Sequence, residues 1–154
     1  MKHTPTVAFD HVSLPVRRIA AARTFYVEAL GAIGMKINMD MGEAFGMGSK
    51  AQKIFWIAKS PKAGGKAHFA FRVDHRDEVD AFYAAALRAG GEDNGAPGPR
   101  PDYGPTYYAA FVHDPEGNNI EVVCYAPAPK GAGAKAKKTA KKKAKNTAKS
   151  TAKR

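Results

Sequence analysis

The sequence has a single cysteine, Cys124, among its 154 residues. It therefore forms no internal disulfide, and such low cysteine usage is typical of the reducing cytoplasm. Long apolar runs are also absent. No stretch approaches the roughly 18 to 20 apolar residues that a membrane helix needs, and residues 1–5 are not followed by the apolar segment of a signal peptide. These absences predict a cytoplasmic protein that makes no contact with a membrane.

Acidic residues are missing from the C-terminal segment. Residues 130–154 hold eleven Lys and Arg residues and no Asp or Glu, so they carry the whole net charge of +11. The rest of the chain, with 14 basic and 14 acidic residues, is neutral. We expect residues 127–154 to form a disordered tail, because their composition cannot bury a core. The tail resembles the Lys/Ala-rich tails of histone-like proteins. It either binds nucleic acid without sequence preference or is simply solvated.

An internal repeat occupies the neutral part of the chain, which we interpret as one domain at residues 5–126. Residues 10–34 and 67–91 match at an offset of 57. Seven of the identical pairs are His11/His68, Val16/Val73, Phe25/Phe82, Tyr26/Tyr83, Ala29/Ala86, Leu30/Leu87 and Gly34/Gly91. Seven identities in register indicate a duplicated supersecondary unit. We place its copies at about residues 7–60 and 66–125.

Each copy is predicted to fold as βαβββ. The first strand of each copy alternates apolar and other residues, and an apolar stripe at helical spacing follows it. Three shorter strands then complete each copy. They are predicted at 35–41, 43–48 and 53–58, and at 92–95, 106–112 and 119–125, with a turn at residues 114–117 between the last two. The fold class is therefore α+β, with two βαβββ modules.

Alternation places three polar side chains on the face away from the helices. His11 and His68 lie opposite the apolar residues of the two opening strands, and Glu121 lies opposite Ile120 and Val122. A buried carboxylate is costly unless it is paired or bound to a cation. Two curved sheets side by side would direct both histidines into one hollow. Two histidines and one carboxylate are a set that suits a divalent transition metal with open coordination positions.

The strand–His openings, the Phe-Tyr helices and the closing Asp-Pro-x-Gly-x-x-x-Glu signature resemble the vicinal oxygen chelate superfamily. This superfamily includes glyoxalase I, fosfomycin transferases, extradiol dioxygenases and bleomycin-sequestering proteins. The resemblance implies a cupped mixed sheet around a central cavity, and His11, His68 and Glu121 as metal ligands. It also implies a metal-dependent, glyoxalase-like enzyme in which Glu121 carries the proton. Sites completed between two subunits are common in the superfamily, so a homodimer is expected by resemblance, but the repeat can equally supply both halves of the hollow within one chain.

Departures from the patterns of individual members leave the reaction open. Aligning Phe55 with Glu121 removes the second carboxylate expected of glyoxalase I. Extradiol dioxygenases usually have a Tyr where this chain has Phe111. Ser13 fits the hydroxyl position of fosfomycin transferases, although their cation-binding loop is not evident. A metal-free protein that binds or sequesters a small molecule is the alternative. The metal would be Zn, Ni, Mn or Fe, and the sequence does not choose among them.

Further residues are candidates for holding a small-molecule substrate. The second copy is longer than the first, mainly through a Pro- and Gly-rich segment at residues 95–104. Binding residues often lie on such loops, although the segment can equally be a stiff structural connection. The substrate-binding candidates, including residues near the ligand positions, are Ser13, Phe55, Arg100, Tyr103, Tyr107 and Tyr108.

Overall fold

The computed structural model describes residues 9–50, 52–64 and 66–128. It contains two modules with the same order of elements. The first consists of β1 (Val12–Val16), α1 (Ile19–Gly31), β2 (Lys36–Asp40), β3 (Ala44–Gly48) and β4 (Phe55–Lys59). The second consists of β5 (His68–Val73), α2 (Arg76–Arg88), β6 (Glu92–Pro99), β7 (Tyr108–His113) and β8 (Asn119–Cys124). The predicted α+β class and the two βαβββ modules are confirmed. The predicted basic tail comprises residues 127–154, and residues 129–154 lie outside the described ranges.

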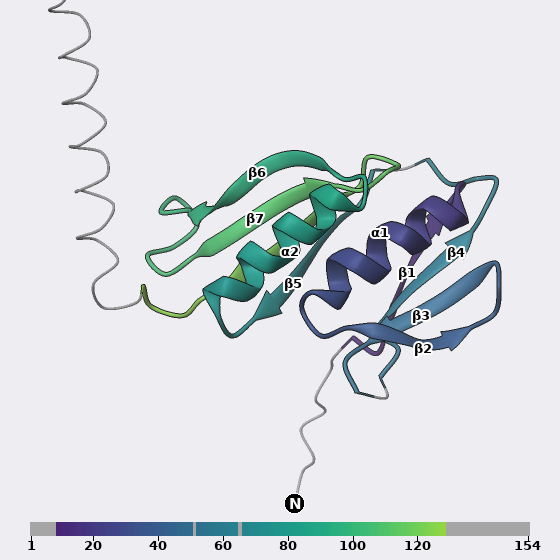
Figure 1. Cartoon of the computed structure of the whole chain (residues 1–154), viewed down its shortest axis with the longest axis horizontal. Helices are drawn as coiled ribbons and strands as arrows, with labels where there is room; N and C mark the ends of the chain where they lie inside the picture. Colours follow the sequence, from purple (N-terminus) through teal and green to yellow (C-terminus); the bar gives the residue numbers. More distant parts are fainter. Residues whose placement is uncertain (1–8, 51, 65, 129–154) are drawn as a thin grey trace, which may run out of the picture.

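Each module forms one four-stranded mixed sheet. The strand orders are β1-β4-β3-β2 and β5-β8-β7-β6, with the first pair parallel and the other pairs antiparallel. One helix covers one face of each sheet, and the two helices lie side by side (Figure 1). The opposite faces of the sheets are left for the side chains that alternation directs away from the helices.

The predicted alternation places the core between each helix and its sheet. In β1, Leu14 and Val16 are buried, and in β8 Ile120, Val122 and Cys124 are fully buried. Each helix buries one stripe against these strands, formed by Ala22, Phe25, Tyr26, Ala29 and Leu30 in α1 and by Val79, Phe82, Ala85 and Ala86 in α2. Burying each large side chain contributes roughly 1.5–3 kcal/mol, so this pattern strongly fixes which face of each strand is inside.

The sequence predicts a weak strand at residues 92–95 followed by a loop, but residues 92–99 form one long edge strand, β6. β6 has eight residues, and its pairing with β7 is irregular between Asp93 and Gly95 and again between Gly95 and Gly98. Gly95 has φ +150, a conformation that side chains other than glycine rarely adopt. These irregularities let a Gly- and Pro-containing segment remain in the sheet, and they shorten the connecting loop to residues 100–107.

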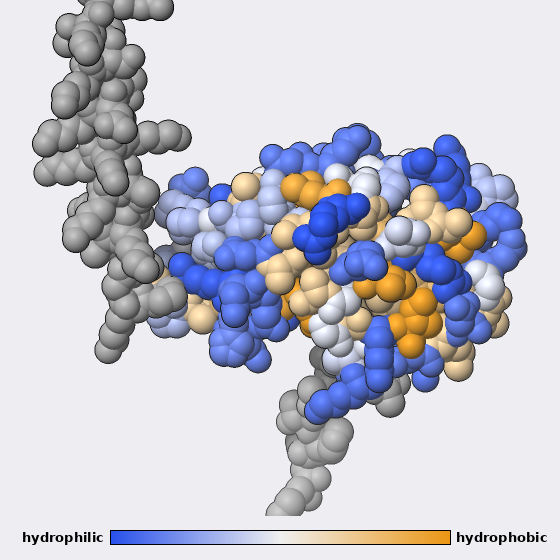
Figure 2. All heavy atoms as spheres, in the orientation of Figure 1, coloured by the Kyte–Doolittle hydropathy of each residue, from blue (hydrophilic) through white to orange (hydrophobic). Residues whose placement is uncertain are grey.

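Aromatic side chains join the two modules. The Phe55 ring centroid lies 5.1 Å from that of Phe69, 5.3 Å from that of Phe71 and 5.4 Å from that of Tyr26. In the face shown by Figure 2, apolar atoms gather along the middle of the molecule and hydrophilic side chains surround them. The modules therefore share an apolar joint that holds their sheets in one arrangement. No helix within the described ranges is long and apolar enough to span a membrane.

Candidate functional site

His68 and Glu121 converge on the open face of the second sheet. His68 begins β5 and Glu121 lies in β8, where the parallel register pairs His68 with Asn119 and Ala70 with Glu121. The distance between His68 Nε2 and Glu121 Oε2 is 3.0 Å. The Glu121 side chain is 4% exposed, whereas that of His68 is 51% exposed. A nearly buried carboxylate therefore meets an imidazole that solvent and ligands can reach.

Polar neighbours hold both members of this pair. The Tyr107 hydroxyl donates a hydrogen bond of 2.5 Å to Glu121 Oε1. Burial first, and then Glu121, raise the pKa of Tyr107 above its ordinary value, so the phenol stays protonated as a donor. The side-chain amide of Asn119 lies 2.7 Å from His68 Nδ1 and accepts a hydrogen bond from Asn94. Both Glu121 oxygens and both nitrogens of the His68 imidazole thus have partners.

The spacing of His68 and Glu121 fits two ligands of one metal ion. Ligand atoms at roughly 2.0–2.2 Å from a metal and at right angles to each other are about 3 Å apart, which matches the distance from His68 Nε2 to Glu121 Oε2. The side-chain NH2 group of Asn119 donates to the other imidazole nitrogen, Nδ1, so the proton of a neutral His68 lies on Nε2 and faces Glu121. The spacing of the two side chains is compatible with a metal ion between them, and binding at Nε2 would displace that proton.

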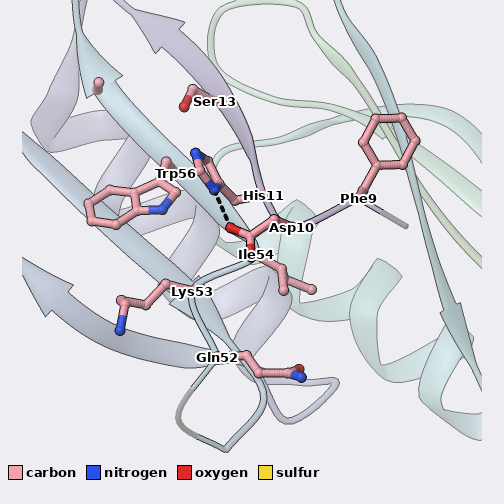
Figure 3. Close-up of a pocket in the computed structure, with 9 residues that line it drawn as sticks. Phe9, Asp10, His11, Ser13, Gln52, Lys53, Ile54 and Trp56 are labelled. Atoms are coloured by element: carbon pink, nitrogen blue, oxygen red, sulfur yellow. Dashed lines mark hydrogen bonds and ion pairs between the residues drawn. The ribbon is translucent and has the colours of Figure 1, made fainter. Parts of the chain in front are cut away.

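His11 lies in a different pocket on the open face of the first sheet (Figure 3). This pocket has a volume of about 630 Å³ and is lined by Phe9, Asp10, His11, Ser13, Gln52, Lys53, Ile54, Trp56 and Ala58. His11 Nδ1 lies 2.6 Å from Asp10 Oδ1, and the side chain is 53% exposed. When Nδ1 donates to a carboxylate, the free electron pair is on Nε2, the arrangement common among metal-ligating histidines.

The two histidines do not meet within one chain. His68 lines a separate pocket of about 500 Å³, together with Asn94, Gly95, Arg100, Tyr103, Phe111 and Asn119. Among the described residues, no group of three or more His, Cys, Asp or Glu side chains is arranged to hold a metal ion. The shared hollow expected from the repeat is therefore not formed by a single chain, because the joint at Phe55, Phe69 and Phe71 brings the helix-facing sides of the modules together.

The residue equivalent to Glu121 in the first module is Trp56, not Phe55. β4 pairs Phe55 with Val12 and Trp56 with Ser13, whereas β8 pairs Ile120 with Phe69 and Glu121 with Ala70. Because Ser13 and Ala70 are repeat equivalents, Trp56 occupies the position of Glu121. Phe55 is 1% exposed in the core, so its assignment as a substrate-binding residue is wrong. An indole cannot ligate a metal, so β4 offers no ligand at the position that Glu121 holds in β8.

The other substrate-binding candidates lie in several places. Ser13 lines the pocket of His11, and Arg100 and Tyr103 line that of His68. Tyr107 contacts Glu121, as described above. Tyr108 faces the helix instead: its hydroxyl donates to Asp80 Oδ1 at 2.8 Å, and burial with Asp80 raises its pKa to about 12. The assignment of Tyr108 as a substrate-binding residue is therefore wrong. Tyr107 and Tyr108 are consecutive residues entering a strand, so their side chains face opposite sides.

Sequence reasoning missed several residues of the two pockets, among them Asn119, Asp10, Trp56 and Asn94. Asn119 has the same parity as Glu121 on β8, so alternation alone places it on the open face. Asp10 precedes His11 directly, and a carboxylate beside a candidate ligand is a recognisable signal. Trp56 gave no such signal because residues 54–57 are all apolar. Asn94 sits in an irregular strand whose faces cannot be read from alternation.

Comparison with known proteins identifies the family. The profile of the Glyoxalase/Bleomycin resistance protein/Dioxygenase superfamily matches residues 8–122. That match covers both modules and ends just beyond Glu121. The chain belongs to this superfamily. No curated protein matches the chain significantly.

Solved structures show the same fold. A glyoxalase/bleomycin resistance protein from Albidiferax ferrireducens is 26% identical, with a TM-score of 0.66 over 77% of this chain and 98% of that one. A lactoylglutathione lyase from Agrobacterium tumefaciens is 21% identical, with a TM-score of 0.58 over 77% of this chain and 94% of that one. A glyoxalase-related enzyme from Fulvimarina pelagi is 20% identical, with a TM-score of 0.61 over 84% and 94%.

Proposed function

We propose that this protein is a metal-dependent, glyoxalase-like enzyme that acts on a small substrate with two neighbouring oxygens. The observation that carries the proposal is the 3.0 Å convergence of His68 Nε2 and Glu121 Oε2 on an open sheet face. Membership of a superfamily that includes enzymes supports it. The reaction would be of the lyase or isomerase type. The metal would be a divalent ion, Zn, Ni, Mn or Fe.

The ligand set is His68 and Glu121 of one copy with His11 of a second copy. His11 and the His68–Glu121 pair occupy separate pockets of one chain, so a complete set requires two chains. We therefore propose a homodimer in which the open face of the first sheet meets the open face of the second sheet of the partner copy. Each dimer would then hold two equivalent sites.

The residues of the site have distinct roles in this proposal. The bound metal would supply Lewis-acid stabilisation of negative charge that develops on the substrate oxygens. Glu121 accepts and returns a substrate proton at Oε1, the oxygen that Tyr107 contacts. Tyr107 holds that oxygen in position and stays protonated because its pKa is raised. Ser13 and Trp56 line the pocket beside His11 and contact the part of the substrate that lies there.

Metal analysis of full-length protein without a metal-affinity tag tests the proposal. We expect about one divalent ion per chain, and conversion of the adduct of methylglyoxal and glutathione in a first activity screen. Glu121→Gln and His68→Gln should each lose the metal. His113→Gln is the matched control, because His113 lies on the same sheet but does not line the pocket of His68. A chain that binds no metal after reconstitution contradicts the proposal.

A metal-free binding protein is the second candidate function. The observation that favours it is that Glu121 is already satisfied by His68 and Tyr107. Within the described residues, no buried side-chain nitrogen or oxygen lacks a hydrogen-bond partner. In that case the pockets would sequester a small molecule without turnover. Ligand binding that is unchanged in Glu121→Gln, together with absence of metal, would select this candidate.

We also propose that residues 130–154 bind nucleic acid without sequence preference. Their eleven cations carry the net charge of the chain, and such binding weakens steeply with salt. Removing residues 130–154 should abolish retention on double-stranded DNA at low salt. Retention that survives the deletion contradicts this proposal. The single cysteine is consistent with a cytoplasmic location, which remains an expectation.

A further inference from the structure

Arg100 is a fixed cation at one end of the pocket that contains His68. Its Nη2 donates a 2.7 Å hydrogen bond to the backbone oxygen of Ala96, and its guanidinium carbon lies 5.5 Å from the ring centroid of Phe111. The backbone N–H of Arg100 donates to the oxygen of Tyr107, and its own oxygen accepts from Tyr103 and Gly104. Both the backbone and the side chain of Arg100 are therefore held in place.

Two glycines leave the space that the guanidinium occupies. A Cβ atom at Gly95 would lie 3.2 Å from Arg100 Nη2 and 3.1 Å from the Phe111 ring, and one at Gly98 would lie 3.4 Å from Arg100 Nη1. The contacts at Gly95 are tighter than ordinary van der Waals contact, whereas the contact at Gly98 is an ordinary one. Glycine at position 95 of the irregular edge strand β6 thus leaves room for the guanidinium beside Phe111.

The charge of Arg100 has no carboxylate partner in the described part of the chain. Two acids of this sheet have other partners: Glu121 contacts His68 and Tyr107, and Asp93 accepts from the backbone of Gly95. A guanidinium has five N–H donors, of which one is used by Ala96. The remaining donors suit the two-pronged recognition of a carboxylate or phosphate group.

We propose that Arg100 binds the oxyanion of a small molecule whose other end lies at His68, the partner of Glu121. The pocket volume of about 500 Å³ is within the range of small-ligand sites. This inference rests on the proposed function, in which the reaction takes place at the His68 end of the ligand. It names the substrate class: a small carboxylate, phosphonate or phosphate ester. Tyr103, at the mouth of the pocket, adds an aromatic surface for the carbon part of the ligand.

Binding of three probes to full-length protein tests the proposal without any assay of turnover. Phenylacetate and phenylphosphonate carry the two kinds of oxyanion, and phenylacetamide is the neutral isostere of phenylacetate. Titrations followed by amide NMR at constant ionic strength should show saturable shifts at Gly95 and Gly98 with the two anions. We expect phenylacetamide to bind at least tenfold more weakly than phenylacetate. The stronger of the two anions identifies the oxyanion class.

Two arginine variants make the comparison specific. Arg100→Gln should weaken the binding of both anions at least tenfold, and Arg100→Lys should weaken it less because the charge remains. Arg72→Gln is the matched control: Arg72 also lies over an aromatic ring, that of Tyr125, but does not line this pocket. It should change affinity less than twofold. Circular dichroism of each variant establishes that it is folded.

The outcomes separate this inference from the proposed function. Anion binding that persists after the protein is stripped of metal with a chelator supports the role of Arg100 even if no metalloenzyme activity is found. Equal binding of phenylacetamide and phenylacetate overturns the proposal. Unchanged affinity in Arg100→Gln, or shifts confined to residues 130–154, overturns it as well, whatever the metal analysis shows.

Discussion

The hydroxyl of Tyr26 in α1 donates a hydrogen bond of 2.7 Å to Asp114 Oδ2 in the turn between β7 and β8. Both residues are buried, and they belong to different modules. Asp114 also accepts hydrogen bonds from the backbone of Glu116 and Asn118 and from the side chain of Asn118. The next acid, Glu116, accepts from the backbone of Arg17 and Arg18 before α1. The Asp-Pro-Glu-Gly turn therefore joins the second module to the helix of the first.

Replacing Tyr26 by Phe should destabilise the protein while leaving its shape intact. The change removes one hydrogen bond to a buried carboxylate, which costs about 1.5 kcal/mol or more of unfolding free energy. Chemical denaturation measures the loss. Tyr83→Phe is the control, since Tyr83 is the repeat equivalent on α2, is only half-buried and faces the exposed Asp93; we expect a smaller loss there, because a hydrogen bond to a solvent-accessible carboxylate contributes less. Equal effects in the two variants would refute a joint at Tyr26.

Stability should fall at alkaline pH partly through Tyr26. Burial first, and then Asp114, raise the pKa of Tyr26 far above its ordinary value of 10.0. Above about pH 10 the unfolded chain loses this proton while the folded chain keeps it. The unfolding free energy therefore decreases as pH rises, by at most about 1.4 kcal/mol per pH unit for one proton. In denaturation series at alkaline pH, Tyr26→Phe should have a shallower slope than wild type. Identical slopes would contradict this assignment.

Tyr107→Phe should weaken metal binding about 10- to 100-fold, the usual effect of removing a partner of a ligand. The reason is that Glu121 Oε1 loses the hydroxyl that holds it. Tyr108→Phe is the matched control, because the neighbouring hydroxyl contacts Asp80 on the helix side. Competition with a chromogenic chelator measures both affinities. Equal affinities for the two variants would show that Tyr107 does not support the carboxylate.

Trp56 provides an optical signal for the His11 half of the site. It is the single tryptophan of the chain and lines the same pocket as His11. A paramagnetic ion such as Ni²⁺, bound with His11 as a ligand, should quench its fluorescence, whereas Zn²⁺, a d¹⁰ ion, should quench it far less. His11→Ala should abolish the Ni²⁺ effect. Strong quenching in His11→Ala would mean that the ion binds near Trp56 through other groups.

The sequence predicted the modules well because their signals are local and repeated. Alternation placed Leu14, Val16 and Glu121 on the observed faces of their strands. It failed at residues 54–57, because a continuous apolar run has no alternation from which to decide that Phe55 is in the core and Trp56 in a pocket. Tyr107 and Tyr108 are adjacent, and adjacent residues entering a strand point to opposite faces, so alternation separates their roles.

The relation between the modules could not be derived from either one alone. The repeat implied that His11 and His68 hold equivalent positions; in the structure His68 begins β5 and His11 directly precedes β1. Whether equivalent positions meet in space depends on which sides of the modules pack together, and that is decided by long-range contacts such as those of Tyr26 with Asp114 and Phe55 with Phe69. The turn at residues 114–117 was predicted as a turn, but its role as a joint needed the tertiary structure.

A mixed dimer of His11→Ala and Glu121→Ala chains tests the proposed two-chain metal site most directly. The two variants would be co-expressed with different peptide tags that do not bind metal, and the mixed dimer purified through both tags. Sites that combine His11 of one copy with His68 and Glu121 of the other predict one metal ion per mixed dimer, two per wild-type dimer and none in either variant alone. A mixed dimer without metal, or full metal content in His11→Ala alone, would contradict the account.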